Sequence, residues 1–173
     1  MSAYLNVQIQ IMQDNLCDLR KIAGWTSESL AEKLGVTKQT ISNLENQKVK
    51  LSRIQYIAIR AVFECEMASN LNNTTLRKVM GVLFYSIPPI YADRKDEVRT
   101  AMLSIASIAA AGLSGLQLHA SATALLSPLG NVANQMDSSR IGDLSLQWLQ
   151  DALESSDSTP NEEILEEETN ENN

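Results

Sequence analysis

The chain has 173 residues, of which 44% are hydrophobic and only 5% aromatic, so it can form one or two small domains with mainly aliphatic cores. Its formal net charge is −7, but residues 1–99 carry thirteen Lys and Arg against ten Asp and Glu, whereas residues 100–173 carry one Arg against eleven acids. Because the local patch sets the electrostatics, the acidic total does not exclude a nucleic-acid partner for the first part.

The N-terminus has no basic stretch followed by an apolar run, which argues against a signal peptide, and a cytoplasmic location is expected. Residues 4–23 are predicted to form the first helix. Its apolar positions at helical spacing are Val7, Ile11, Leu16 and Leu19. Asp14 and Asn15 interrupt this pattern, so the segment before Leu16 either continues the helix or forms a separate arm.

A short second helix is predicted in the stretch from Trp25 to Gly35, and Thr26 or Ser27 is expected to cap it. Its buried face is expected to contain Leu30, Ala31 and Leu34. Gly35 follows at a position where a helix ends in the left-handed conformation, which glycine adopts without a Cβ penalty.

Thr37 is expected to cap a third helix through residue 46, with Ile41 and Leu44 buried. The outward side chains of this helix are Lys38, Gln39, Thr40, Ser42 and Asn43. Two short helices joined by a turn of this length are typical of a helix-turn-helix. Amide, hydroxyl and lysine side chains suit the major groove of DNA, although polar residues also face water on most surface helices.

Lys48 and Lys50 follow in a loop where contacts to DNA phosphates are expected. A fourth helix is predicted for residues 52–67. Its core face is expected to contain Ile54, Ile57, Ala58, Ala61, Val62 and Phe63. Cys17 and Cys65 are interpreted as small buried residues rather than a redox pair.

A fifth helix is predicted from Asn73 or Thr74 to residue 86, before Pro88 and Pro89. Its apolar stripe is Leu76, Val79, Met80, Leu83, Phe84 and Ile87, which must pack within the chain or on a second copy. Asp93 is expected to cap a sixth helix that has Asp96 and Glu97 in its first turn.

Residues 100–136 contain no Asp, Glu, Lys or Arg. A buried or self-associating helix is the favoured interpretation, because serines and glutamine interrupt the run; a membrane span is the alternative. Residues 116–124 alternate as in a strand, but their alanines favour a helix. His119 has no partner at metal-ligand spacing, so no metal site is predicted.

A last helix is predicted for residues 143–153, with Trp148 as an anchor against the body. Residues 154–173 carry eight acids and no base, a composition typical of a disordered tail. Such a tail is expected to serve solubility; the alternatives are that it competes with DNA for the basic face or binds a basic partner.

Residues from about 16 to 63 resemble the Xre-type helix-turn-helix family of phage Cro and repressor proteins. The matching residues are Leu19-Arg20, Gly24-Trp25, Leu30-Ala31, Leu34-Gly35-Val36, Ile41-Ser42 and Leu44-Glu45-Asn46. The chain departs from the family at Gln47, where Gly is usual, and at Ser27 or Ser29, where Gln or Glu is usual.

The resemblance implies roles for individual side chains. Four would read bases in the major groove: Lys38, Gln39, Thr40 and Asn43. Three would contact phosphates: Ser27, Asn46 and Lys48. Arg20 and Glu45 would form an ion pair between the first helix and the end of the third.

The sequence therefore predicts an all-α protein with three parts. Residues 1–70 are expected to form a four- to five-helix, lambda-repressor-like helix-turn-helix domain, residues 71–153 a helical region for dimerisation or partner binding, and residues 154–173 a disordered acidic tail. The expected function is sequence-specific binding of double-stranded DNA by a homodimeric transcriptional repressor. The alternatives are an antitoxin-like or adaptor protein that binds a protein partner through residues 100–136, and a membrane-attached regulator. No catalytic constellation or cofactor site is evident, so an enzyme is not expected.

Overall fold

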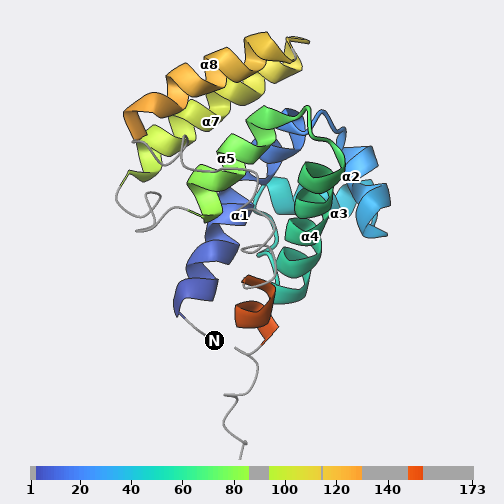
Figure 1. Ribbon diagram of the computed structural model, residues 1–173. Coiled ribbons are helices and arrows are strands. Elements are labelled where there is room, and N and C mark those ends of the chain that lie inside the picture. Colours follow the sequence, from blue (N-terminus) through green and yellow to red (C-terminus); the bar gives the residue numbers. More distant parts are fainter. Residues whose placement is uncertain (1–2, 86–93, 114, 130–147, 154–173) are drawn as a thin grey trace, which may run out of the picture.

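A computed structural model describes residues 3–85, 94–113, 115–129 and 148–153. Within these ranges the regular structure is helical, with no strand, which confirms the predicted all-α class (Figure 1). Figure 1 shows α2 (Ser27–Leu34), α3 (Lys38–Glu45) and α4 (Arg53–Ser69) on one side of α1 (Ala3–Ile22), and α7 (Lys95–Ala110) and α8 (Leu116–Leu126) on the other.

Helix α1 (Ala3–Ile22) runs without a break through Asp14 and Asn15, so the separate-arm interpretation is wrong. Asn15 is buried, and its side-chain amide donates to the Ile11 carbonyl oxygen at 2.8 Å, which keeps the residue inside the helix. Leu16 and Leu19 are fully buried, whereas Val7 is exposed. Helices α3, α4, α5 (Thr74–Phe84) and α7 all pack directly against α1.

Helix α2 (Ser27–Leu34), helix α3 (Lys38–Glu45) and helix α4 (Arg53–Ser69) follow in order. The N-cap of α2 is Thr26, whose hydroxyl oxygen accepts from the backbone N–H of Ser29 at 3.0 Å. Gly35 has a φ of 66°, which places it in the left-handed region expected at this turn. Helix α4 begins with a capping box in which Ser52 and Gln55 bond each other's backbone N–H groups.

The buried face of α4 is not the predicted one. Its buried residues are Tyr56, Ile59, Arg60, Phe63 and Met67, so of the predicted face only Phe63 is fully buried. Ile54 is 80% exposed, Ala58 and Ala61 are exposed, and Ile57 and Val62 are half-buried. The prediction failed because the true face contains an arginine, which periodicity counts as a surface residue.

Arg60 is 2% exposed because aromatic rings from several elements enclose its guanidinium group. Its central carbon lies 4.9 Å from the ring centroid of Phe84, 5.2 Å from that of Tyr85 and 4.4 Å from that of Trp148. The Glu64 carboxylate lies 3.6 Å from its Nε and accepts a hydrogen bond from the Tyr85 hydroxyl. Burial raises the pKa of Glu64, although Tyr85 and Arg60 oppose the shift.

Helix α5 (Thr74–Phe84) buries the predicted stripe from Leu76 to Phe84 within the chain, while Ile87 lies outside the described residues. Helix α7 (Lys95–Ala110) packs along α1 and has Asp96 and Glu97 in its first turn, whereas its predicted cap, Asp93, is not among the described residues.

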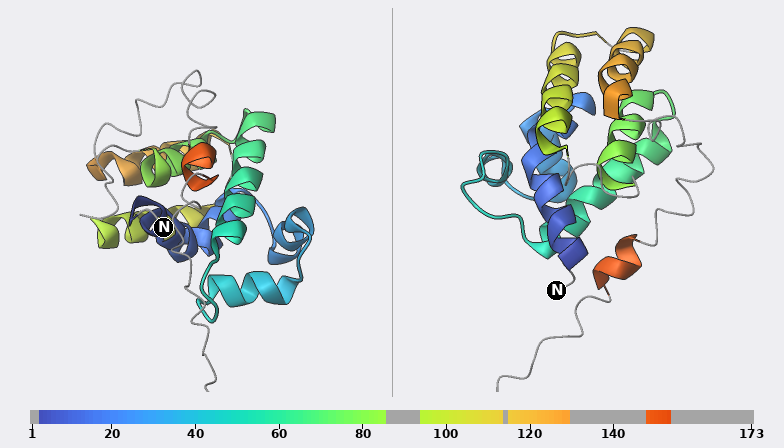
Figure 2. Two further views of the ribbon diagram at one scale, coloured as in Figure 1. Left: turned by 90° about the horizontal axis from the view of Figure 1, so that it is seen from below. Right: turned by 90° about the vertical axis from the view of Figure 1, so that its left-hand side faces the viewer.

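Helix α8 (Leu116–Leu126) returns antiparallel to α7 and also packs on α5 (Figure 2), so the helical interpretation of this stretch is confirmed. A short 3₁₀ turn, η1 (Ser127–Leu129), follows α8. No helix within the described ranges has both the length and the apolar character that crossing a bilayer requires.

The two cysteines do not share one environment. Both are free thiols; Cys17 is half-buried and Cys65 is exposed on α4. The prediction of burial is therefore wrong for Cys65. Cys65 lies on the predicted face of α4, and that face is not the one that the structure buries.

Candidate nucleic-acid interface

Helix α3 is held at both ends by backbone hydrogen bonds. At its start, the Thr37 hydroxyl oxygen accepts from the Thr40 N–H at 3.1 Å. At its end, the backbone N–H of Gln47 donates to the Leu44 carbonyl oxygen at 3.1 Å, and that of Lys48 to the Asn43 carbonyl oxygen at 2.9 Å. This pair of bonds is a Schellman ending, which usually has a glycine at the position of Gln47.

Gln47 has a φ of 56°, the one positive value at a non-glycine residue among the described residues. The backbone therefore adopts a left-handed turn here although the residue lacks the freedom of glycine. The side-chain amide of Gln47 donates to Asp14 Oδ1 at 3.1 Å, which ties the end of α3 to α1.

The predicted base-reading residues lie on the outer side of α3, and several are bonded to neighbours. Gln39 Nε2 donates to Asn43 Oδ1 at 2.9 Å, so the two amides form one connected polar surface. The Thr40 hydroxyl lies 2.9 Å from that of Thr37. Gln39 is exposed, whereas Thr40 and Asn43 are half-buried.

Lys38 is exposed, and its Nζ lies 3.5 Å from a carboxylate oxygen of Glu28 on α2. Both side chains are about two-thirds exposed, at 63% and 66%, so the pair contributes little to stability. It does matter for electrostatics, because Glu28 offsets one positive charge on this face.

The predicted phosphate contacts lie on three elements around α3. Ser27 is the first residue of α2 and is half-buried. Asn46 is the C-cap of α3, and its side-chain amide donates to the Ser42 carbonyl oxygen at 2.8 Å. Lys48 is exposed in the loop after α3, as is Lys50.

Arg20 on α1 and Glu45 on α3 lie in direct contact. Their closest atoms, Arg20 Nε and Glu45 Oε1, are 2.5 Å apart, and Arg20 Nη2 to Glu45 Oε2 is 3.2 Å. The side chains are only 11% and 9% exposed. Arg20 Nη1 also donates to the Trp25 carbonyl oxygen at 2.8 Å. Burial lowers the pKa of Arg20, but its hydrogen bond and charge interaction with Glu45 outweigh burial and raise that pKa.

Sequence reasoning missed Gln13, which holds the loop after α3. Its Nε2 donates to the carbonyl oxygens of Leu44 and Val49, at 3.3 and 2.6 Å, and its Oε1 accepts from the Leu51 N–H at 3.0 Å. Gln13 is 6% exposed. One signal was available, since this amide stands at a position of α1 where helical spacing calls for an apolar residue.

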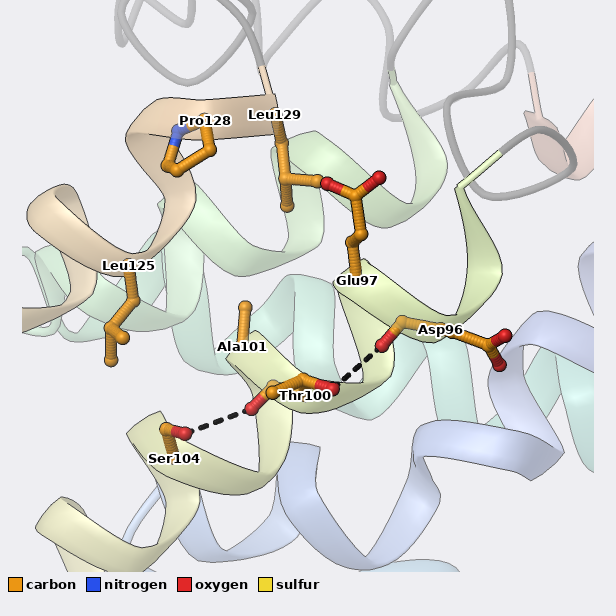
Figure 3. Close-up of a pocket in the computed structure, with 8 residues that line it drawn as sticks. All are labelled: Asp96, Glu97, Thr100, Ala101, Ser104, Leu125, Pro128 and Leu129. Carbon is orange, nitrogen blue, oxygen red and sulfur yellow. Dashed lines mark hydrogen bonds between the residues drawn. The ribbon is translucent and has the colours of Figure 1, made fainter.

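A pocket of about 340 Å³ lies away from α3, between α7 and the end of α8 (Figure 3). Its walls are largely apolar, and its hydroxyls bond within their own helix: Thr100 donates to the Asp96 carbonyl oxygen and Ser104 to that of Thr100. Arg94 holds the carboxylate of Glu97. Among the described residues, no group of three His, Cys, Asp or Glu side chains is placed to hold a metal ion.

Comparison with known proteins supports the helix-turn-helix interpretation. Residues 18–70 match the model of a protein family described as helix-turn-helix. No curated protein and no solved structure shows a significant match to the chain. The matched segment spans α2, α3 and α4 and includes both residues of the Arg20–Glu45 pair. Residues 18–70 are therefore similar to a helix-turn-helix domain, in agreement with the resemblance found in the sequence, and the match supports a DNA-binding helix-turn-helix regulator.

Proposed function

We propose that the protein is a sequence-specific DNA-binding transcriptional repressor that occupies promoter DNA. The observation that carries this proposal is the polar outer surface of α3, which is capped at its start, anchored by Arg20 at its end and part of the matched segment. A helix presented in this way can enter the major groove and direct its amides to base edges.

Lys38, Gln39, Thr40 and Asn43 are assigned to base reading in this proposal. Gln39 is the sharpest case, because its amide is exposed and already aligned by Asn43. An amide that bonds an adenine edge discriminates between bases by about 1–3 kcal/mol.

Ser27, Asn46 and Lys48 are assigned to the phosphate backbone. Such contacts fix the position of the protein on DNA and carry no sequence information. Each neutralised phosphate adds about 0.9 to the slope of log affinity against log salt concentration.

The test is fluorescence anisotropy of the full chain with promoter-proximal DNA from its own locus and with random DNA, across a salt series. The Gln39→Ala variant is expected to lose discrimination between the two DNAs, whereas Lys48→Ala is expected to weaken both alike and to flatten the salt slope. Glu32→Gln is the control, since Glu32 is exposed on α2. Equal loss on every DNA from Gln39→Ala would contradict base reading.

The second candidate function is binding to another protein chain, and exposed leucines of the α7–α8 hairpin support it. Leu103, Leu113 and Leu116 are 49%, 43% and 83% exposed, and the stretch around them carries no charged residue. We assign this surface to a second copy of the chain, because dimers of such domains bind two half-sites. Sedimentation should detect a dimer that Leu116→Gln weakens; a monomer at all concentrations would point to the adaptor alternative.

A further inference from the structure

Residues 148–153 are helical and pack on α4, which is far from them in the sequence. The ring of Trp148 lies 4.4 Å from the Arg60 guanidinium carbon and meets the Tyr56 ring edge-on, with 6.0 Å between centroids. Ala152 is fully buried. Cation–π and apolar contacts therefore fix this segment to the domain that contains α3.

Arg53 holds the other end of the docked segment. Its guanidinium group donates to the carbonyl oxygen of Ala152 and, at 3.0 Å, to that of Leu153. Arg53 is the first residue of α4, the end at which the chain arrives from α3 through the loop that carries Lys48 and Lys50. The docked segment thus lies beside the N-terminal end of α4 (Figure 2).

The chain that follows this anchor is strongly acidic. Residues 154–173 contain eight Asp and Glu and no Lys, Arg or His. A chain of this length spans up to about 65 Å when extended, which is more than the distance across a small domain. The acidic segment therefore follows an anchor held by Arg53, which comes three residues after Lys50 in the sequence, and it is long enough to reach the loop that carries Lys48 and Lys50.

The loop offers charges that match. Lys48 and Lys50 are exposed, and neither forms an ion pair with any other described residue. An anchored polyanion and exposed lysines within its reach attract each other, and the attraction weakens with salt.

We propose that residues 154–173 bind Lys48 and Lys50 and compete with DNA phosphates for them. This inference rests on the proposed DNA-binding function. Tethering gives the acidic segment a local concentration in the millimolar range. Against a weak electrostatic contact with a dissociation constant of about 1 mM, such a concentration lowers DNA affinity about two- to tenfold.

The competition has a definite salt signature. At low salt the tail neutralises the lysines, so DNA must displace it and the net release of counterions is smaller. At high salt the tail contact is screened and the competition disappears. Removing the acidic charges should therefore raise DNA affinity at low salt and steepen the salt slope by about one unit for each lysine that is freed.

The experiment uses the full chain with six glutamates neutralised. The charge-neutral variant combines Glu162→Gln, Glu163→Gln, Glu166→Gln, Glu167→Gln, Glu168→Gln and Glu171→Gln. A matched control replaces tail residues without changing charge: Asn161→Ser, Asn170→Ser and Asn172→Ser. Two readouts are taken: DNA affinity by anisotropy across a salt series, and the amide chemical shifts of Lys48 and Lys50 without DNA.

The charge-neutral variant should bind DNA about two- to tenfold more tightly at about 50 mM salt and converge on the parent chain above about 200 mM. Its Lys48 and Lys50 amide signals should shift, and those of the control should not. Unchanged affinity would overturn the inference while leaving the proposed function intact. Tighter binding without shifts at these amides would also overturn it, because general charge repulsion would then explain the gain.

If neither the parent chain nor any variant binds DNA, the proposed function is refuted and only the amide shifts test the tail contact. A shift at Lys48 and Lys50 would then support the tail contact. The absence of a shift would refute the tail contact as well. The anchor has its own variant, Ala152→Gln, which should undock the segment and lengthen the free chain. DNA affinity at low salt should then rise part of the way towards the charge-neutral variant. No rise would refute the role of the anchor.

Discussion

The Arg20–Glu45 pair gives the sharpest test of how α3 is supported. It joins α1 to the end of α3 through two hydrogen bonds and is about nine-tenths buried. Glu45→Gln leaves a buried guanidinium without its counter-charge but keeps one acceptor, so we expect a loss of about 2–3 kcal/mol in the free energy of unfolding. Arg20→Met should lower the free energy of unfolding by about 3–5 kcal/mol, because the buried Glu45 carboxylate and the Trp25 carbonyl oxygen both lose their hydrogen-bond donor.

The double variant should cost about as much as Arg20→Met alone, which gives a coupling energy of about 2 kcal/mol. Urea unfolding at neutral pH measures each corner of this cycle, and Glu32→Gln on the exposed side of α2 is the control, with a change within about 0.5 kcal/mol. If Glu45→Gln costs less than about 0.5 kcal/mol and the single losses simply add, the pair does not support α3 and our reasoning is wrong.

Three further predictions concern the loop after α3 and the junction of α5 with α8. The Gln47→Gly variant should be more stable than Gln47→Ala by about 1 kcal/mol in urea unfolding, because both lose the bond to Asp14 and only glycine adopts the left-handed turn freely; equal stability would contradict this. Gln13→Met should lower stability by about 1–3 kcal/mol and speed hydrogen exchange at the Leu51 amide, since three backbone groups lose their partner; unchanged exchange would argue against its role in holding the loop. Burial, and then the charge of Lys78, lower the pKa of His119, so the folded state favours the neutral ring and the free energy of unfolding should fall as the pH drops from 7.5 to 5.5. His119→Gln should flatten that dependence in parallel urea titrations, and an unaltered slope would show that other groups cause it.

Local features of the domain were predictable because a few neighbouring residues determine them. Gly35 ends α2 in the left-handed conformation, and Thr37 caps α3 through its hydroxyl, as expected from their positions. The departure at Gln47 was also visible in the sequence, because glycine is usual at this position in the family that the segment resembles. In the structure Gln47 has the positive φ that glycine adopts more easily.

Features that depend on distant partners were not predictable. Helix α4 has two overlapping apolar faces, and the sequence favours the one without an arginine. Burial of Arg60 depends in part on the rings of Phe84 and Trp148, which are far along the chain and could not be paired with it from the sequence. The pairing of Lys38 with Glu28 likewise requires the relative placement of two helices. The base-reading and phosphate-contacting roles stay predictions.

The two tryptophans of the chain are built-in optical reporters of different junctions. Trp25 stacks on Phe63, with 5.2 Å between centroids, and has the Lys33 ammonium 4.9 Å from its ring centre, so its emission monitors how the loop before α2 packs on α4. Trp148 instead contacts Arg60, and its emission monitors whether residues 148–153 are docked. A variant that keeps only one indole would therefore distinguish release of the C-terminal anchor from opening of the domain, without any added dye.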